Sequence, residues 1–512
     1  MKKSISILII FLLILLTASI TACQSKTPPG EINNTMESKK NNLIIALPEN
    51  IQSLDPQNTN SLNSMRVIAN INETLVKLAE NGELVPGLAE KWEVSSDGLE
   101  YIFYIKKGIK FHNGEELKAD DVVFTFERAM ASPFAGAVFG SVKSVEKIDE
   151  YAVKVTLKYQ YVPFLAALTA PVSSIVNKNA VETAKEEYGR NPVGTGAYKF
   201  VAWVSGDKVD LEAFGEYHVG AVPIKNVTFK IIQDSTTAVI ALQSGQIDAM
   251  INIPSIEIKN IKKDSKLTLY ETPSALYEYV GMNTQKAPFD NVKVRQAIAY
   301  ALDKEGIVFA VAEGAGIVAN NQLIDSIFGY TAEVKPYPYN VEKAKALLAE
   351  AGYQNGFKVE ITTIDGHRKN IAQIVVDNLQ KIGIEAKVSV LENVAYLDKA
   401  KSGQIEMFVT GWNTPVPDAD LGLFFSFNSG MINAMNYTRY SNEQMDDLLK
   451  RGRTTPDSKE RLNIYKEALE LLHNDVPNIP LYYTMTNIAA NKDLKGVKAV
   501  PTSTYLIYNF SW

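Results

Sequence analysis

The amino-acid sequence predicts an α/β protein with more than one domain. Its 512 residues exceed the length that a single hydrophobic core usually organises. Residues 357–390 change from strand-like to helix-like periodicity and back, which is typical of a strand–helix–strand unit with parallel strands. The pair Asp97–Gly98 separates two runs rich in β-branched and aromatic residues and therefore predicts an antiparallel hairpin.

The composition is that of an ordinary globular protein. Hydrophobic residues make up 46% of the chain and charged residues 21%, and the net charge is −6. A nucleic-acid-binding protein would carry clustered Lys and Arg side chains, and the sequence has no such cluster. Cys23 is the single cysteine, which excludes a disulfide framework and a CxxC motif. We therefore expect no nucleic-acid partner and a fold that relies on core burial.

The N-terminus has the pattern of an export signal. Lys2 and Lys3 precede an apolar run over residues 5–16, and small residues lead from this run to Cys23. An uncleaved helical anchor is the alternative, because the uncharged stretch continues to Ser25.

The segment Ile20–Cys23 resembles a bacterial lipobox, in which the cysteine is acylated and becomes the first residue of the mature chain. We therefore expect a lipoprotein signal peptide over residues 1–22 and lipidation at Cys23. The polar residues 23–42 that follow are expected to form a flexible tether.

The body of the chain opens with an apolar strand at residues 42–47. Two strands of a hairpin are expected over residues 92–105. A helix is expected from Ala119 to Arg128, because acidic residues at its start suit the helix dipole.

The second half of the chain contains the strand–helix–strand unit. Asn340 is expected to cap a helix that Gly352 ends. Apolar residues then alternate over 357–361, recur at helical spacing over 371–382 and alternate again over 386–390. This order predicts two parallel strands joined by a right-handed crossover.

The sequence carries no pattern of a catalytic centre. None of its four histidines is spaced as in HExxH, and GxSxG and Walker A motifs do not occur. We therefore expect neither enzyme activity nor a cofactor or metal.

The best candidate for a binding site follows a strand at residues 407–410. Trp412 leaves this strand into a loop that holds Asp418 and Asp420, and in open α/β sheets ligands lie outside the carboxyl ends of the strands. We predict that these three residues bind ligand. Two alternatives stay open: the aspartates could cap the loop through Asx-turns, and Trp412 could be a core residue.

His367 and Arg368 form a second candidate, between the strand at residues 357–361 and the next helix. Arg368 could pair with a ligand carboxylate, and the start of the helix would favour the same negative group. The alternative is a solvated surface arginine.

Long motifs make the chain similar to a known family. The segment Trp92–Arg128 matches a signature of the family 5 extracellular solute-binding proteins of ABC importers almost residue for residue. Residues 191–200, 241–248 and 294–304 match further segments of that family, and the resemblance covers the chain after residue 42.

The resemblance implies a two-lobed, periplasmic-binding-protein-like clamshell of class II and large type, with an extra N-terminal subdomain. The expected parts are lobe I over 43–72, 190–278 and 490–512, the inserted subdomain over 73–189, and lobe II over 279–489. The chain would cross between the lobes near 279–283 and 482–489, so we add Asn283 to the predicted ligand-binding residues.

The resemblance also implies a function. It predicts a monomeric lipoprotein, anchored by lipid on the outer surface of a Gram-positive cell, that captures short peptides and delivers them to an ABC permease. Trp412 would line the cavity. Dipeptide-binding members carry an aspartate three residues after this tryptophan, where this chain has Pro415. A binder of glutathione-like compounds or of nickel chelates is therefore the alternative.

Overall fold

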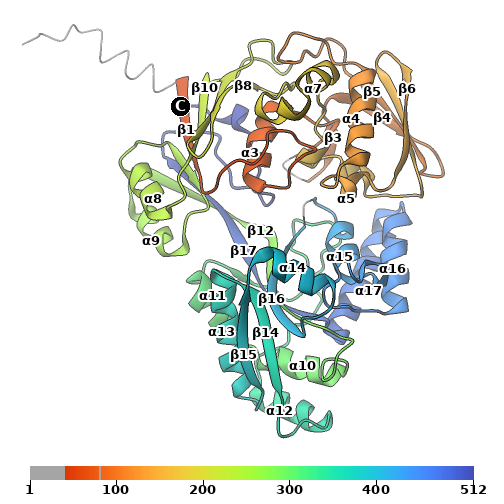
Figure 1. Ribbon diagram of the computed structural model, residues 1–512, viewed down its shortest axis with the longest axis vertical. Helices are drawn as coiled ribbons and strands as arrows, with labels where there is room; N and C mark the ends of the chain where they lie inside the picture. The colour runs from red at the N-terminus through yellow and green to blue at the C-terminus, as the bar shows by residue number, and fades with distance from the viewer. Residues whose placement is uncertain (1–40, 80–81, 415) are drawn as a thin grey trace, which may run out of the picture.

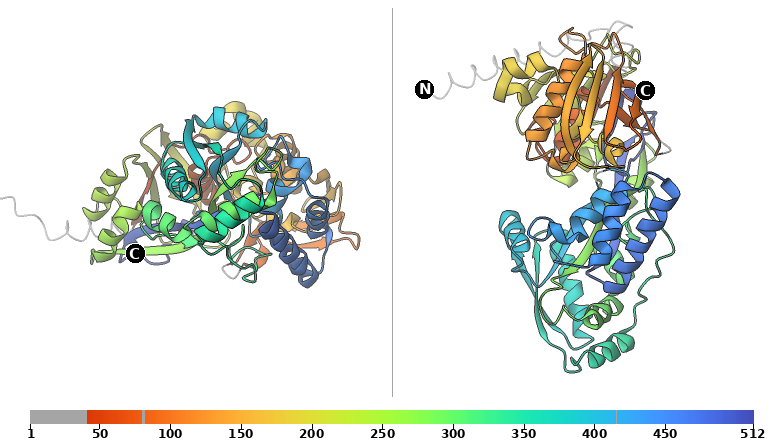
Figure 2. Two further views of the ribbon diagram at one scale, coloured as in Figure 1. Left: turned by 90° about the horizontal axis from the view of Figure 1, so that it is seen from below. Right: turned by 90° about the vertical axis from the view of Figure 1, so that its right-hand side faces the viewer.

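The computed structural model describes residues 41–79, 82–414 and 416–512 and shows an α/β protein with two lobes joined by two long strands, β12 (Leu267–Met282) and β17 (Asn478–Asn491) (Figure 1). The right-hand view of Figure 2 shows the same two lobes from the side, with these strands between them. The α/β class predicted from the sequence is confirmed. The predicted signal peptide and Cys23 lie outside the described residues, as does the tether up to residue 40.

Lobe I is built on the part of the main sheet nearest the N-terminus. Its elements are β1 (Asn42–Leu47), α3 (Leu62–Ile71), β8 (Tyr198–Val204), β9 (Lys208–Ala213), β10 (Asn226–Ile231), α8 (Ser235–Gln243), β11 (Ala249–Ile251) and α9 (Ser255–Lys263). β1 lies between β10 and β11 and is parallel to both. The C-terminal segment returns to this lobe, where Ile507 and Phe510 join its core.

A subdomain follows α3 in the chain and packs beside lobe I. Its elements are β2 (Val76–Leu78), β3 (Leu84–Pro86), β4 (Ala89–Val94), β5 (Glu100–Ile105), α4 (Ala119–Ala131), α5 (Gly136–Phe139), β6 (Val142–Asp149), β7 (Ala152–Leu157), α6 (Phe164–Ala167) and α7 (Lys178–Ala184). Four of its strands form an antiparallel sheet in the order β4-β5-β7-β6. The predicted hairpin around Asp97–Gly98 is confirmed, since β4 pairs with β5.

Lobe II contains the other end of the main sheet. Its elements are α10 (Val292–Ala301), α11 (Lys304–Ala312), β13 (Ile317–Val318), α12 (Val341–Glu350), β14 (Lys358–Ile364), α13 (His367–Gln380), β15 (Glu385–Leu391), α14 (Asn393–Lys401), β16 (Met407–Asn413), α15 (Ala419–Phe427), α16 (Glu443–Thr454) and α17 (Ser458–Asp475). The predicted strand–helix–strand unit is confirmed as β14, α13 and β15, with parallel strands. Asn340 caps α12 as expected, by accepting a hydrogen bond from the Lys343 N–H.

The main sheet runs through both lobes in the order β15-β14-β16-β12-β17-β11-β1-β10-β9-β8. β12 and β17 are antiparallel, and their pairing register shifts between Pro273 and Tyr277. The residues of β12 before this shift pair with β17 in lobe I, and those after it pair with β16 and β17 in lobe II. The shift therefore marks the place where the sheet passes from one lobe to the other.

The strand directions converge on this crossing. β11 is antiparallel to β17, so it runs from lobe I toward the crossing. β1 is parallel to β11, and β10 is parallel to β1, so both run in the same direction as β11. β16 is antiparallel to β12 and approaches from lobe II, with β14 and β15 parallel to it. The carboxyl ends of both sets of parallel strands consequently point toward the opposite lobe.

The subdomain also contacts lobe II. Val416 and Leu421 are buried in the same hydrophobic cluster as Phe103, Phe126 and Phe164 of the subdomain. The Val162 N–H donates a hydrogen bond to the backbone carbonyl of Arg453 at 2.8 Å. The α15–α16 region is thus joined to the subdomain as well as to lobe II.

Among the described residues, none of the helices combines the length and the apolar character that a membrane span requires.

Candidate functional site

The carboxyl ends of the parallel strands mark the candidate site. In open α/β sheets this edge is where ligands bind, because loops and helix N-termini gather there. In lobe II the edge is formed by the ends of β14 and β16 and by the start of α13. Tyr277 of β12 pairs with Trp412 of β16, which places Trp412 next to the crossing between the lobes.

A buried carboxylate lies at this edge. Glu278 of β12 has no solvent-exposed surface. Arg368 donates to both of its oxygens, from Nε to Oε2 at 2.9 Å and from Nη2 to Oε1 at 3.1 Å. His367 Nε2 lies 3.0 Å from Oε1. His367 and Arg368, both predicted from the sequence as ligand-binding residues, therefore contact the same carboxylate. Glu278 itself was not among the predicted residues.

The charges of this cluster are set by its contacts. Burial by itself raises the pKa of Glu278, but the hydrogen bonds and charges of His367 and Arg368 outweigh it and lower the pKa below its usual value. Burial lowers the pKa of Arg368, and the carboxylate of Glu278 reverses this and raises it. Glu278 is thus an anion and Arg368 a cation at neutral pH.

The main chain of Gly411 makes room for the pair. A Cβ atom at this position would lie 2.5 Å from Arg368 Nη2 and 2.9 Å from Glu278 Oε1. Any other residue would push the charged groups away from the strand. A glycine one residue before Trp412 is therefore part of the geometry of the site.

Trp412 follows on the other face of the sheet. Its ring is half-buried and packs against the cluster that contains Tyr277 and Tyr279, while Glu278 points to the opposite face by strand alternation. Its indole N–H is buried and has no hydrogen-bond partner among the described residues. Trp412 thus offers an unused donor beside the crossing.

Asp418 and Asp420 have partners within the protein. Both oxygens of Asp418 accept hydrogen bonds from Arg461, at 2.7 and 2.6 Å, and Oδ1 also accepts from the Asp420 N–H at the start of α15. Asp420 is held by Arg453 in a second bidentate pair. Burial raises the pKa of Asp420, although Arg453 opposes the shift. The capping alternative therefore describes Asp418 in this structure, and a ligand-binding role for either aspartate stays a prediction.

Asn283 is not brought to this group. It follows the last residue of β12, at the end of the strand away from Trp412. Its side-chain amide donates to the carbonyls of Gly403 and Ile405, and its oxygen accepts from the Gln285 N–H. Its described contacts serve the turn after β12. Pro415 lies outside the described residues.

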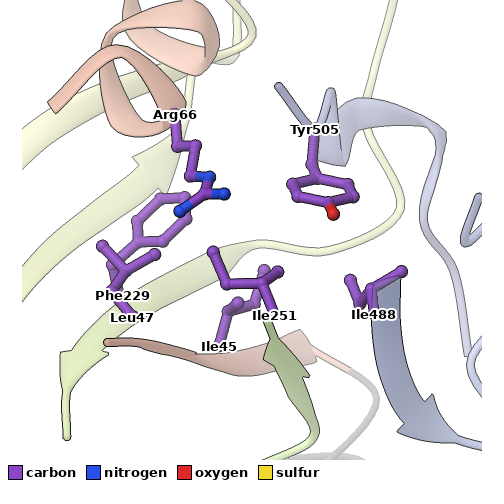
Figure 3. Close-up of a pocket in the computed structure, with 7 residues that line it drawn as sticks. All are labelled: Ile45, Leu47, Arg66, Phe229, Ile251, Ile488 and Tyr505. Carbon is purple, nitrogen blue, oxygen red and sulfur yellow. The ribbon is translucent and has the colours of Figure 1, made fainter. Parts of the chain in front are cut away.

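Lobe I presents a buried arginine at the ends of its own strands. Arg66 of α3 lies above Ile45 and Leu47 of β1 and faces a small cavity with Tyr505 on its other side (Figure 3). Its guanidinium donates to the Ser503 carbonyl and to the side-chain oxygens of Asn63 and Asn252, so its described partners are neutral. Burial lowers the pKa of Arg66 to about 10. The remaining lining residues, Phe229, Ile251 and Ile488, are apolar.

A metal centre is not apparent in the described part of the chain. No group of three or more His, Cys, Asp or Glu side chains within it is arranged to hold an ion.

Comparison with known proteins decides the family. The model of the bacterial extracellular solute-binding proteins, family 5, matches residues 83–433, which is more than half of the chain. The chain belongs to this family. Its members bind solutes for transport, so the protein is a solute-binding protein of an ABC importer and not an enzyme.

Individual family 5 relatives cover most of the chain. The heme-binding protein A of Haemophilus influenzae is 34% identical over 84% of this chain and 84% of its own length. The dipeptide-binding protein of Escherichia coli is 31% identical over 84% of this chain and 86% of its own length. The solved structure of the ABC transporter-associated periplasmic binding protein DppA from Helicobacter pylori, in complex with the peptide STSA, shares 31% identity. It covers 93% of this chain and 99% of its own with a TM-score of 0.81, which confirms the predicted two-lobed fold.

Sequence reasoning missed Glu278, Arg66, Arg453 and Arg461. A signal for Glu278 existed, since it is a charged residue inside the apolar run Leu276–Met282. A charge in a buried strand requires a partner. The other three residues are arginines on helices, and their partners become apparent only in the fold.

Proposed function

We propose that the protein captures short peptides outside the cell and delivers them to the permease of an ABC importer. The observation that carries the peptide assignment is the cluster of Glu278, His367 and Arg368 at the carboxyl ends of the lobe II strands. A carboxylate and a guanidinium are the groups that recognise the ammonium and carboxylate of a peptide. The names of two relatives, a dipeptide-binding protein and a peptide complex, support the same ligand class.

Arg368 would receive a carboxylate of the peptide. Its Nε and Nη2 atoms are used by Glu278, and Nη1 has no hydrogen-bond partner among the described residues. The residue stands in the first turn of α13, whose N-cap, Gly366, supplies no side-chain hydrogen bond. Unpaired N–H groups at a helix start favour a negative group.

The lobes would close on the ligand by bending at the crossing. We place the hinge at Pro273–Tyr277 of β12 and at the facing residues 483–485 of β17, where the pairing register shifts. The crossing expected at residues 279–283 moves accordingly, because Tyr279 pairs with Thr410 and Pro480 inside lobe II. Closure would exclude water and strengthen each polar contact with the peptide. The expected boundaries of the lobes and the subdomain otherwise stay part of this proposal.

Calorimetry with the purified protein tests the ligand class. Di-, tri- and penta-alanine, glutathione, heme and Ni²⁺ with L-histidine are the probes. We expect the peptides to bind with a Kd below about 10 μM, which corresponds to roughly 7 kcal/mol. Tight binding of heme, glutathione or the nickel complex without any response to peptides would overturn the assignment.

Two tryptophan variants locate the site. Trp412→Phe should weaken peptide binding because it removes the indole N–H at the crossing. Trp92→Phe is the matched control, since Trp92 lies on β4 in the subdomain. If both variants bind peptide with equal affinity, Trp412 is not part of the binding site.

The protein would be a monomer held on the outer surface of a Gram-positive cell by acyl chains on Cys23. Stable anchoring requires more than one acyl chain, and a diacylated cysteine supplies them. Cys23→Ser should move the protein from the membrane fraction to the medium and abolish labelling by a palmitate analogue, whereas Ser25→Ala should change neither. Retention of Cys23→Ser at the membrane would argue for an uncleaved helix instead.

A further inference from the structure

Glu278 is a costly residue to keep in its position. It is fully buried on β12, which lies between β16 and β17 inside the main sheet, and taking a carboxylate out of water costs several kcal/mol before its partners compensate. An apolar side chain of similar size would often serve the fold as well. Its neighbours in β12, Tyr277 and Tyr279, are buried in an aromatic cluster that does not need the charge. The carboxylate therefore requires a reason beyond packing.

Its two partners hold it in unequal ways. Arg368 is mostly buried and binds both oxygens, so it forms a fixed countercharge. His367 contributes one contact to Oε1, and 55% of its side chain is exposed to solvent. A single contact from an exposed side chain contributes little free energy and is easily exchanged. His367 is thus the replaceable partner on the solvent side of the cluster.

A carboxylate also has capacity for a further donor. Two oxygens offer about four acceptor positions, and the described contacts to Arg368 and His367 use three of them. If an ammonium group replaced His367, it would find one position vacated and another unused. Its hydrogen bonds would join two charged groups, and such bonds are among the strongest in proteins.

We infer that Glu278 binds the α-ammonium group of the ligand, which displaces His367 from Oε1 while Arg368 stays paired. This inference rests on the proposed peptide function and adds its specificity-determining residue. It explains how the site can hold a peptide N-terminus although Pro415 stands where dipeptide-binding members carry an aspartate. Ligands with a free N-terminus are selected, and His367 acts as the group that occupies the carboxylate in the empty protein.

Calorimetry with tri-alanine and N-acetyl-tri-alanine tests the inference. Wild-type protein should prefer the free peptide by on the order of 10- to 100-fold, the range for a hydrogen bond to a charged group. Glu278→Gln keeps the shape of the side chain and should reduce the affinity for the free peptide to that for the acetylated one. The ratio of the two affinities is the readout, because any effect of the variant on Arg368 acts on both peptides alike. Preservation of the preference in Glu278→Gln would overturn the inference.

His367→Ala supplies a second readout that does not disturb the buried pair. It should bind the free peptide as tightly as wild type or a few-fold more tightly, because no side chain competes for Oε1, and it should keep the preference over the acetylated peptide. Loss of the preference in His367→Ala would show that the histidine itself reads the N-terminus. Loss of the preference in His367→Ala would therefore overturn the inference even if Glu278→Gln fails to fold.

The experiment separates the role of Glu278 from the peptide function. If wild-type protein binds both forms of tri-alanine equally, the role of Glu278 is wrong and the peptide function stands. If it binds neither form and no other peptide, the peptide function fails and the inference fails with it.

Discussion

The hydroxyl of Tyr161 donates a hydrogen bond of 2.8 Å to Oδ2 of Asp420, and both residues are buried. Tyr161 belongs to the subdomain, and Asp420 stands in the first turn of α15, eight residues after Trp412. Arg453 pairs with the same carboxylate from α16 and stacks on the ring of Phe424. One aspartate thus joins the subdomain, two lobe II helices and the loop that leads back to the candidate site.

Tyr161→Phe should weaken this junction without creating a large cavity. The variant removes one hydrogen bond to a charged group, which is worth about 1.5–3 kcal/mol, and leaves the pair with Arg453 intact. We expect a loss of unfolding free energy in this range, measured by urea denaturation. Tyr159→Phe is the control, because the Tyr159 side chain is exposed. Equal stability of the two variants would mean that the junction contributes nothing.

The same loop shows how far the sequence could lead. Strand β16 and the parallel β14–β15 pair follow from local periodicity, and both are present. The predicted exit at Trp412 is wrong, because β16 continues to Asn413 and Trp412 pairs with Tyr277 inside the sheet. The partners of the two aspartates do not follow from local periodicity. Asp418 pairs with Arg461, which is 43 residues away, and the choice between a ligand contact and a buried ion pair depends on how α16 and α17 pack.

The contact between Glu278 and Arg368 could not be predicted from the sequence. The sequence placed Arg368 at a helix start near a strand end, which is where the structure has it, but not the carboxylate that orients it. β12 and α13 are separated by 90 positions at this contact. Only the sheet order, in which β16 lies between β14 and β12, brings them together.

Asp418→Asn should be strongly destabilising. Asp418 and Arg461 are both buried and form a bidentate pair, and the asparagine would leave the guanidinium without its countercharge. Removing one partner of a buried ion pair costs about 3–5 kcal/mol. The asparagine can still cap α15, so the loss reports the charge alone. Asp447→Asn on α16 is the control, since its pair with Arg451 is exposed and should contribute less than about 1 kcal/mol.

His112 should make stability depend on pH in a defined window. Its Nε2 lies 2.9 Å from the Gly196 carbonyl, and its Nδ1 accepts a hydrogen bond from the Gly194 N–H, so the folded protein holds the neutral ring. Burial lowers the pKa of His112 to about 4, against about 6.5 in the unfolded chain. Only the unfolded state takes up the proton between these values. The stabilisation is therefore complete above pH 6.5 and is lost as the pH falls toward 4, by up to about 3 kcal/mol.

His112→Gln provides the comparison for this window. The glutamine cannot titrate, so the gap in unfolding free energy between wild type and variant should narrow from pH 7 to pH 4. Urea denaturation at four pH values measures it. A gap that stays constant would show that His112 does not titrate differently in the folded and unfolded states.

Gly356→Ala should destabilise lobe II more than Gly352→Ala. Both glycines have positive φ angles, 70° and 85°, so each substitution incurs left-handed strain of roughly 1–2 kcal/mol. A Cβ atom at Gly356 would lie 1.7 Å from the Gly383 carbonyl oxygen, whereas at Gly352 it would meet nothing within 4 Å. The clash forces apart the turns that precede β14 and β15, and we expect it to add about 1–3 kcal/mol. Urea denaturation of both variants isolates the clash, because the strain common to both cancels in the difference. Equal losses would show that the two turns separate freely.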